Sequence, residues 1–344
     1  MAIDKSTDYF NSVTWTGDGS SSRNITGVGF QPDWVWGKCR NTTVSHALYD
    51  VVRGGSKLLN SNSNAAEGTN AALSAFVSDG FSVNSDSYFN ANSNTYVAWN
   101  WLAGGTASSN SDGSLASSVS ANTTAGFSIV KYTGNATNST VGHGLGVTPQ
   151  VLIVKNLDST GGSAEHWRVQ HHKVAASKVL YLNRTNAEDN NGDFQSTYPG
   201  SSTFSISSAD GCNKNGEENI AYCFAEKKGY SKFGSYTGNG NAEGTFVYTG
   251  FRPAWVMVKR TDTTGNWLMY DNKRNTFNLT GSHLAADENR AESTESTGID
   301  FVSNGIKMRN TFSNLNASSG TYIYLAFAEF PFVTSGTKAA GTAR

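Results

Sequence analysis

Charged residues and long apolar runs are both scarce in this sequence. Only 15% of its 344 residues are charged and the formal net charge is −1; no basic cluster is present that would attract nucleic acid or an anionic membrane surface. No stretch approaches the roughly 18 apolar residues of a membrane-spanning helix. The opening residues, MAIDKSTDYFNS, lack the apolar segment of a secretory signal. We therefore expect no nucleic-acid partner and no membrane insertion. We also expect the chain to be made in a cytoplasm without a secretion signal.

Cysteine is rare, and the usual catalytic motifs are missing. Cys39, Cys212 and Cys223 form no Cys-x-x-Cys pair and leave one residue over in any disulfide scheme, which favours reduced, structural thiols. There is no Gly-x-Ser-x-Gly elbow, phosphate-binding glycine loop or EF-hand, and no metal-ligand spacing surrounds His171 and His172. The sequence thus predicts no cofactor, no metal site and no catalytic residue.

A three-fold internal repeat is what the sequence does contain. Each copy begins with an aromatic residue followed by Thr-Gly, and the same number of residues separates that aromatic residue from a proline in all three copies. The copies read WTGDGSSSRNITGVGFQPDWVWGK from Trp15, YTGNATNSTVGHGLGVTPQVLIVK from Tyr132, and YTGNGNAEGTFVYTGFRPAWVMVK from Tyr236. Alignment without a gap indicates a triplicated structural unit.

Each copy carries a glycine, a proline and a lysine at matched positions. These signature residues are Gly29, Pro32 and Lys38; Gly146, Pro149 and Lys155; and Gly250, Pro253 and Lys259. The glycine suits a turn and the proline suits the entry to a strand. The apolar run between proline and lysine predicts a strand that is covered on both faces. We expect the lysine to mark the return of the chain to water.

The units also end alike, in strands that alternate large with mostly smaller side chains. The matched segments are TYVAWNW at 95–101, NIAYCF at 219–224 and TYIYLAF at 321–327. This alternation with a period of two is typical of a strand. We expect the large side chains to fill a sandwich core within each unit, and the small ones to permit close approach by a neighbour.

Together these patterns predict an all-β protein of three tandem, related antiparallel β-sandwich modules of the jelly-roll or lectin-like kind. The expected boundaries are 1–105 for module 1, 132–235 for module 2 and 236–333 for module 3. Residues 106–131, rich in Ser, Gly and Asn, read as a linker and entry strand, and residues 334–344 as a flexible tail.

Two kinds of ligand chemistry are compatible with the residues. Aromatic rings beside carboxylates suit sugar binding, because a ring stacks on a sugar face while polar groups bind its hydroxyls. The candidates are Trp267, Tyr270 and Asp271, their matched residues Tyr49 and Asp50, and Trp167. The alternative for these rings is a place in the core. Asp271 with Glu329 or Glu292 is the alternative carboxylate pair for a glycoside hydrolase.

Several stretches resemble repeat-bearing virion structural proteins of marine tailed bacteriophages. The resembling residues touch all three units; they include ITGVGFQPDWVWGKCRN, LYDVVRGG, VGHGLGVTPQVLIVKN, AYCFAEKKGYSKFGSYTGNGNAEGTFVYTGFRPAWVMVKRTD and GTYIYLAFAEFPF. The resemblance implies a concanavalin-A-like, tail-fibre or appendage protein without established catalytic residues. It implies location in the virion after assembly in the host bacterial cytoplasm.

From this resemblance we expect a non-enzymatic virion protein that attaches to the particle or contacts a host-surface glycan. Its expected partners are other virion proteins, a host glycan and further copies of itself, since virion symmetry favours homo-oligomers. A capsid decoration or head-fibre protein is one alternative, and a surface-polysaccharide hydrolase is another.

Overall fold

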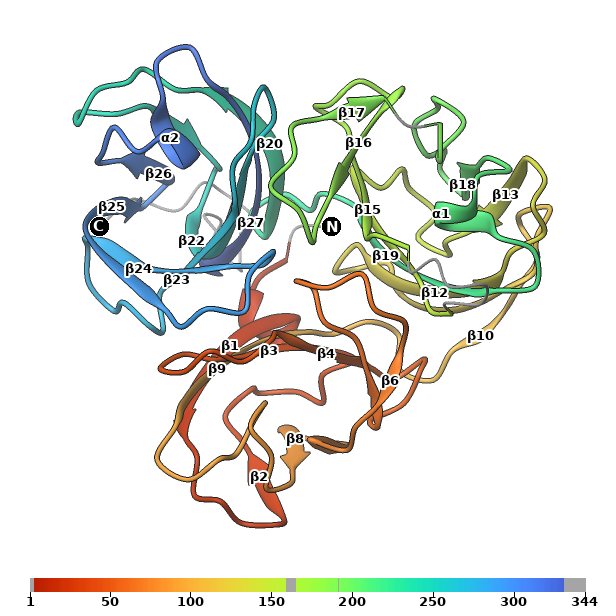
Figure 1. The fold of residues 1–344 in the computed structure, drawn as a ribbon, viewed down its shortest axis with the longest axis horizontal. Coiled ribbons are helices and arrows are strands. Elements are labelled where there is room, and N and C mark those ends of the chain that lie inside the picture. The colour runs from red at the N-terminus through yellow and green to blue at the C-terminus, as the bar shows by residue number, and fades with distance from the viewer. Residues whose placement is uncertain (1–2, 159–164, 191, 331–344) are drawn as a thin grey trace.

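The protein is all-β, with antiparallel strands that form three lobes around a common centre (Figure 1). The computed structural model describes residues 3–158, 165–190 and 192–330, without the side chains of 295–297. We call residues 3–103 lobe 1, the described part of 108–224 lobe 2, and residues 231–330 lobe 3.

Lobe 1 contains a four-stranded sheet in the order β1-β9-β3-β4, a three-stranded sheet β2-β8-β7 and the pair β5-β6. Its elements are η1 Ser6–Asp8, β1 Phe10–Thr16, β2 Arg23–Ile25, β3 Trp34–Cys39, β4 Ala47–Asp50, β5 Lys57–Leu58, β6 Gly68–Thr69, β7 Leu73–Val77, β8 Gly80–Val83 and β9 Thr95–Trp101.

Lobe 2 contains an eight-stranded sheet, β10-β11-β12-β19-β14-β15-β16-β17, and the pair β13-β18. Its elements are β10 Ser108–Asn110, β11 Ser117–Asn122, β12 Phe127–Thr133, β13 Ser139–Gly142, β14 Val151–Asn156, β15 Arg168–His171, β16 Lys178–Tyr181, β17 Asp189–Asn190, β18 Thr203–Ile206, α1 Asp210–Asn213 and β19 Glu218–Phe224.

Lobe 3 is built on one eight-stranded sheet, β20-β27-β22-β23-β24-β25-β26-β21. Its elements are β20 Ser231–Thr237, β21 Phe246–Tyr248, β22 Arg252–Arg260, β23 Trp267–Asp271, β24 Thr280–Ala285, β25 Ser293–Val302, β26 Gly305–Met308, α2 Ser313–Asn316 and β27 Thr321–Phe330.

The same four-strand arrangement recurs in the lobes, as β1-β9-β3-β4, β12-β19-β14-β15 and β20-β27-β22-β23. The glycine of each signature adopts a positive φ, of 90° at Gly29, 68° at Gly146 and 84° at Gly250, a conformation that glycine adopts without steric cost. The prolines that follow are all buried. Pro253 lies at an irregularity in the β22–β27 register, a position where a strand tolerates the missing N–H.

The expected boundaries at 131/132 and 235/236 fall inside strands β12 and β20. The aromatic-Thr pair ends the first strand of each four-strand arrangement rather than preceding it. The segment 106–131 is accordingly more than a linker, because β10, β11 and most of β12 extend the sheet of lobe 2. Ser and Asn composition concealed strand pairing in this segment.

The core lies where the three lobes meet. A central cluster joins the large side chains of the three closing strands: Val97, Trp99 and Trp101 from β9; Ile220, Tyr222 and Phe224 from β19; and Ile323, Leu325 and Phe327 from β27. The small residues on the opposite faces, Ala98, Ala221, Cys223 and Ala326, pack in separate clusters inside the lobes. The expected assignment of the faces was therefore inverted. Alternation shows which side chains share a face, but it does not show which face turns toward a neighbouring lobe.

Candidate functional site: the buried lobe interfaces

The six residues expected to bind a sugar are all buried. The exposed fraction is at most 1% for Tyr49, Asp50, Trp167, Trp267, Tyr270 and Asp271. Tyr49 and Tyr270 belong to the internal clusters of lobes 1 and 3, whereas Trp167 and Trp267 belong to the central cluster. None of these rings offers a face to solvent in this structure. Four of the six, Trp167, Trp267, Asp50 and Asp271, instead make polar contacts between lobes, and these interfaces form the candidate site.

One set of interface contacts repeats around the molecule. At three matched positions a buried aromatic ring nitrogen meets a main-chain carbonyl oxygen of the preceding lobe in cyclic order, and in each case that carbonyl lies on a matched segment. The pairs are Trp167 Nε1 with Asn60 O at 3.0 Å, Trp267 Nε1 with Tyr181 O at 2.9 Å, and His46 Nε2 with Ala285 O at 2.9 Å. Lobe 2 thus contacts lobe 1, lobe 3 contacts lobe 2, and lobe 1 contacts lobe 3.

A second repeated set involves the Ala-Glu dipeptide of each copy. The backbone N–H of each glutamate donates to a carbonyl that follows the signature lysine of the next lobe. The pairs are Glu67 N with Leu157 O at 2.8 Å, Glu188 N with Thr261 O at 2.9 Å, and Glu292 N with Arg40 O at 2.6 Å. Both sets are cyclic: lobe 3 contacts lobe 1 through the same kinds of bond that connect lobe 1 with lobe 2 and lobe 2 with lobe 3.

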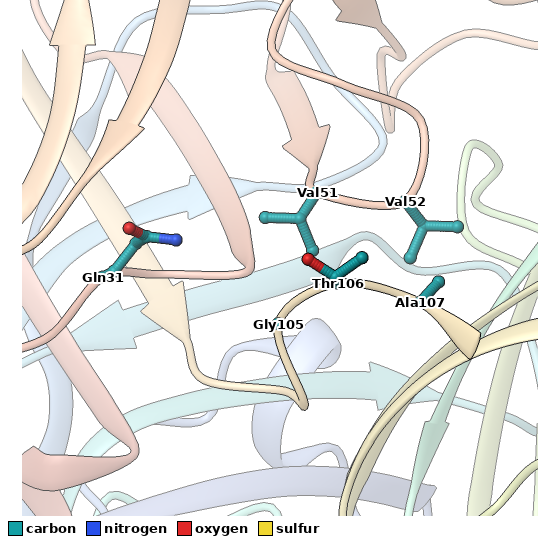
Figure 2. Close-up of a pocket in the computed structure, with 6 residues that line it drawn as sticks. All are labelled: Gln31, Val51, Val52, Gly105, Thr106 and Ala107. Carbon is teal, nitrogen blue, oxygen red and sulfur yellow. The ribbon is translucent and has the colours of Figure 1, made fainter.

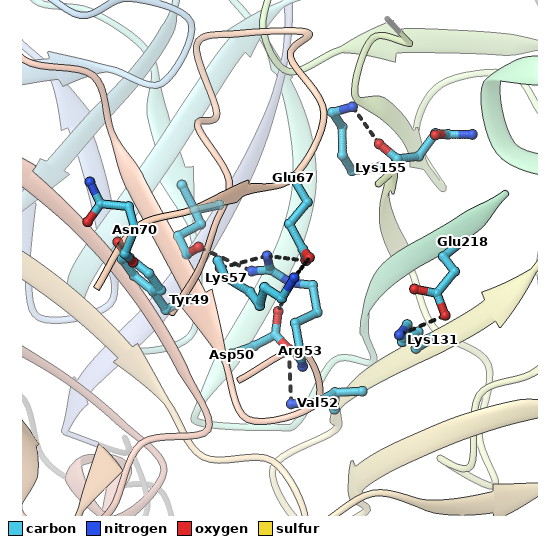
Figure 3. Close-up of polar contacts among 12 residues, drawn as sticks. Tyr49, Asp50, Val52, Arg53, Lys57, Glu67, Asn70, Lys131, Lys155 and Glu218 are labelled. Carbon is cyan, nitrogen blue, oxygen red and sulfur yellow. Dashed lines mark hydrogen bonds and ion pairs between the residues drawn. The ribbon is translucent and has the colours of Figure 1, made fainter. Parts of the chain in front are cut away.

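A buried ionic network supports the interface between lobes 1 and 2 (Figure 3). Asp50 Oδ2 accepts from Arg53 Nε at 2.6 Å and from the hydroxyl of Tyr222, on β19 of lobe 2, at 2.7 Å. Arg53 Nη1 also lies 3.2 Å from Glu67 Oε2, and Lys57 Nζ lies 3.1 Å from Glu67 Oε1. The backbone N–H of Arg53 donates to the second oxygen of Asp50. Such complete pairing is what a buried charge requires.

The interface between lobes 3 and 1 contains the same network at matched positions. Asp271 Oδ2 accepts from Arg274 Nε at 2.6 Å and from the indole N–H of Trp99, on β9 of lobe 1, at 3.0 Å. Arg274 Nη1 donates to Glu292 at 3.0 Å. Arg40 from lobe 1 then donates to both oxygens of Glu292, at 2.9 and 3.0 Å. This second network therefore has two side chains from the neighbouring lobe.

The charges of both networks are mutually stabilised. Burial lowers the pKa of Arg53 and of Arg274, but the adjacent Asp50 and Asp271 outweigh it and raise the pKa of each guanidinium above its ordinary value. Burial raises the pKa of Glu292, yet the hydrogen bonds and charges of Arg40 and Arg274 lower it on balance. Arg53, Arg274 and Glu292 are consequently ionised at neutral pH.

Among the described residues, the interface between lobes 2 and 3 has no such network. His171 occupies the position of Asp50 and Asp271, and Val174 replaces the arginine. Leu325 of lobe 3 stands where Tyr222 and Trp99 stand in the other lobes. Burial lowers the pKa of His171 to about 3, so its ring is neutral. The aspartate, the arginine and the hydrogen-bond donor from the neighbouring lobe have thus all been replaced at this interface.

The signature lysines are also buried, contrary to the expected return to water. Lys38, Lys155 and Lys259 are 0% exposed, and each ammonium donates to main-chain carbonyls, as Lys259 does to Thr185 O at 3.0 Å and Gly265 O at 2.8 Å. Burial lowers the pKa of each to about 8. The lysines therefore provide hydrogen-bond donors for backbone carbonyl groups near the lobe interfaces.

Two hollows lie beside the turn that follows β4, at the boundary of lobes 1 and 2. One has a volume of about 280 Å³ and is lined by Gln31, Val51, Val52, Gly105, Thr106 and Ala107 (Figure 2). The other, of about 390 Å³, lies between Val52 and a hydroxyl-rich surface of β11 and β12 that includes Ser118 and Thr133. The Lys131–Glu218 ion pair, 2.8 Å between Nζ and Oε1, borders the second hollow (Figure 3).

The arginines and the hydrogen-bond donors of the networks were missed in the sequence. Asp-x-x-Arg recurs at 50–53 and 271–274 and is absent from the matched segment of the second unit, so a signal for the arginines was present. Nothing in the local sequence identifies Trp99 and Tyr222 as the partners, because their acceptors lie 172 residues away along the chain.

The described part of the chain contains neither a metal-binding cluster nor a membrane-spanning helix. Its residues include no group of three or more His, Cys, Asp or Glu side chains placed to hold a metal ion. Across residues 3–158, 165–190 and 192–330, no helix has the length and apolar character needed to span a membrane. Cys39, Cys212 and Cys223 are free and buried, as expected for structural thiols.

A family profile described as Domain of unknown function (DUF7483) matches residues 5–331. The chain belongs to this family. The matched DUF7483 region spans all three lobes and both buried networks, so the family unit is the three-lobed body rather than one lobe. Among curated proteins, none matches the chain.

Proposed function

We propose that this DUF7483 protein is a non-enzymatic structural protein of a bacteriophage virion, acting as a tail or fibre-type appendage. We further propose that each lobe is a copy of one ancestral antiparallel β-sandwich module with a jelly-roll or lectin-like arrangement. The observation that carries the structural role is the cyclic set of glutamate N–H to carbonyl bonds between lobes. The resemblance to marine phage proteins supports the virion as the location.

The cyclic contacts favour a rigid body that transmits load. The two arginine networks use buried charge to fix the orientation of one lobe against the next, and removal of one partner from such a pair is costly. The central cluster adds stacked rings from different lobes, including Trp34 and Tyr222, whose centroids are 4.3 Å apart. A particle component that must hold its shape outside the cell benefits from this bracing.

The same chemistry weakens the case for a hydrolase. A glycosidase needs one carboxyl group with a raised pKa to protonate the leaving oxygen. Glu292 has a lowered pKa and is held by two arginines. Asp271 is bound to Arg274, and Glu329 lies 3.0 Å from Arg252. Each candidate carboxylate is therefore engaged in an ion pair.

Contact with a host-surface glycan, other virion proteins and further copies of the chain remains part of the proposal. Since the six original aromatic and acidic candidates are buried, any glycan contact in the native body uses other surfaces, such as the hydroxyl-rich hollow at Ser118 and Thr133. Glycan-array binding by the full chain tests this component. Weaker binding by Thr133→Val, with an unchanged unfolding midpoint, would locate the contact there.

Localisation in the particle is the decisive experiment. Antibodies against the purified chain should label intact virions of the encoding phage at the tail, and mass spectrometry should find the chain in those virions. Labelling of the head would favour the capsid decoration alternative. Absence from purified virions would refute the structural role. Release of oligosaccharide from host envelope polysaccharide by the purified chain would overturn the non-enzymatic assignment.

A further inference from the structure

Exposed large apolar side chains are concentrated in lobe 3. Among the described residues, five of the seven large hydrophobic side chains that are classed as exposed belong to this lobe, including Phe246 at 46% and Tyr248 at 62% exposed. Phe246 and Tyr248 lie on one face of β21, which ends the strand order of its sheet. The Phe246 ring rests against Gly305 of the neighbouring strand β26. Aromatic residues thus flank an open sheet edge.

Each lobe has a strand equivalent to β21. The three strands, β2, β13 and β21, pair with β8, β18 and β26 in the same register, in which Ile25 faces Phe81, Val141 faces Phe204, and Val247 faces Ile306. This register places Thr140 of lobe 2 and Asn24 of lobe 1 at the position of Phe246. It places Gly142 and Thr26 at the position of Tyr248.

In lobe 2 the chain itself covers this edge. Leu115 forms a parallel bridge with Val141, and its N–H donates to Thr140 O at 3.0 Å. The N–H of Thr140 donates to Ser114 Oγ at 2.9 Å, and Ser117 Oγ donates to Gly142 O at 3.1 Å. The Leu115 side chain packs against the internal cluster of lobe 2. An extended segment containing Gly113-Ser114-Leu115 therefore provides hydrogen-bond partners for the backbone groups on the outer edge of β13.

In lobe 3 the same backbone groups face away from β26, and of these the Tyr248 carbonyl accepts a hydrogen bond from the Tyr324 hydroxyl at 3.4 Å. Thr249 N donates to Asn304 O and Met308 N donates to Thr245 O, so the alternation of an antiparallel pair turns the N–H and C=O groups of Phe246 and Tyr248 away from β26. Both side chains there are exposed aromatics, whereas the matched residues of lobe 1, Asn24 and Thr26, are polar and exposed. Natural proteins usually protect an open edge with polar or charged residues. Lobe 1 follows that rule and lobe 3 departs from it.

We propose that the β21 edge of lobe 3 is a docking site for an extended peptide segment of another protein, added beside β21 as residues 113–117 are added beside β13. The segment carries a small residue, a hydroxyl residue and an apolar residue in succession. Main-chain hydrogen bonds to the N–H and C=O groups of Phe246 and to the N–H of Tyr248 hold it, and the two rings cover its apolar side chain. This mode of strand addition depends on backbone pairing for affinity and on side-chain contacts for selectivity.

The test uses the full chain and a labelled synthetic peptide, NSDGSLASS, which reproduces residues 110–118. Fluorescence anisotropy should show saturable binding to the full chain. Phe246→Pro removes one outward N–H and one ring without removing a β21–β26 ladder bond, and should weaken binding at least about tenfold. Phe246→Lys with Tyr248→Lys retains the backbone but charges the edge, and should weaken binding similarly.

Phe277→Lys is the matched control, since Phe277 is an exposed aromatic residue of the same lobe outside β21. It should leave peptide binding unchanged, and thermal unfolding should confirm that all three variants are folded. No saturable binding to the wild-type chain, or equal binding to Phe246→Pro, would overturn the proposal. A dimer of the chain alone that Phe246→Pro abolishes would identify a second copy as the occupant and overturn the assignment to a different protein. These outcomes are independent of whether the chain is found in virions.

Discussion

The three lobe interfaces are matched in position but differ in chemistry. The two interfaces of lobe 1 contain charged networks, whereas the described part of the interface between lobes 2 and 3 does not. Lobe 1 meets both neighbours through a buried Asp-Arg-Glu network that accepts a hydrogen bond from Tyr222 or Trp99. Lobes 2 and 3 meet with His171, Val174 and Leu325 at the matched positions. The backbone glutamate bonds are common to all three interfaces. Cyclic backbone pairing is thus the shared element, whereas the ionic network is an addition whose members change together.

The joint change at the third interface follows from the energetics of burial. An aspartate that has lost its arginine would be an uncompensated buried charge, and an indole or hydroxyl that has lost its acceptor would be an unsatisfied donor. Replacing all partners with neutral or apolar groups of suitable shape avoids both costs. The repeat therefore provides an internal comparison of a charged and an uncharged version of one interface.

The largest effect should come from breaking the charged version. Arg274→Met leaves Asp271 and Glu292 buried without their shared partner, and we expect the free energy of unfolding to fall by about 3–5 kcal/mol. Urea denaturation monitored by tryptophan fluorescence measures this change. Arg290→Met is the control, because the Arg290–Glu288 pair is largely solvent-accessible and should contribute less than about 1 kcal/mol. Equal effects of the two substitutions would refute the structural importance of the network.

A smaller effect should follow from removing only the donor that crosses between lobes. Tyr222→Phe deletes the hydroxyl that bonds Asp50 at 2.7 Å, and should cost about 2 kcal/mol because the acceptor is charged. Tyr230→Phe is the matched control: Tyr230 is equally buried, but its hydroxyl has no hydrogen-bond partner among the described residues. Its removal should leave stability unchanged or raise it. Greater loss at Tyr230 than at Tyr222 would contradict the assignment.

The smallest effect should be shared by all interfaces, because it arises from the signature lysines. Burial lowers the pKa of Lys155 to about 8, whereas an unfolded lysine titrates near 10.4. Below pH 8 both states are protonated and the full cost of burying the charge is present. Between pH 8 and 10 the folded state has lost the proton that the unfolded state retains, so this group makes the protein more stable as pH rises.

Lys155→Met should remove that pH dependence. The stability difference between wild type and variant should shift in favour of wild type by about 1 kcal/mol from pH 7.5 to 9, measured by urea titration at each pH. Comparing the two chains cancels the opposing ionisation of buried thiols and tyrosines. The exposed Lys173→Met serves as the reference substitution. A difference between wild type and Lys155→Met that does not vary with pH would show that the Lys155 amine is not buried as described.

Much of the local structure was accessible from the sequence. The spacing of Gly29, Gly146 and Gly250 before the prolines predicted turns, and each glycine has a positive φ. The alternation in the segments at 95–101, 219–224 and 321–327 predicted strands that the structure contains. Both signals are local, because a turn and a strand are set by neighbouring residues. The all-β class and its antiparallel sheets followed from these elements.

The arrangement of the lobes was not accessible in the same way. The large faces of β9, β19 and β27 look alike whether they fill a lobe or meet another lobe. The buried lysines illustrate the same limit, since Lys259 ends an apolar run but is buried and donates to Thr185 O of lobe 2. Of the sugar-binding candidates, Trp167 and Trp267 are buried for this reason, in the central cluster. Such features depend on contacts between residues far apart in the chain, 74 positions for Lys259 with Thr185 and 107 for Trp167 with Asn60, which a single sequence does not encode locally.

The contact of Arg40 with Glu292 spans 252 residues and connects the first lobe to the last. During synthesis, a ribosome has therefore made most of the chain before lobe 1 can acquire its final partner. Until β27 emerges, the aromatic surfaces that the first two lobes contribute to the central cluster are not covered by lobe 3. We therefore expect a prematurely terminated chain to expose apolar surface, to aggregate and to depend on chaperones, rather than to fold as a smaller functional protein.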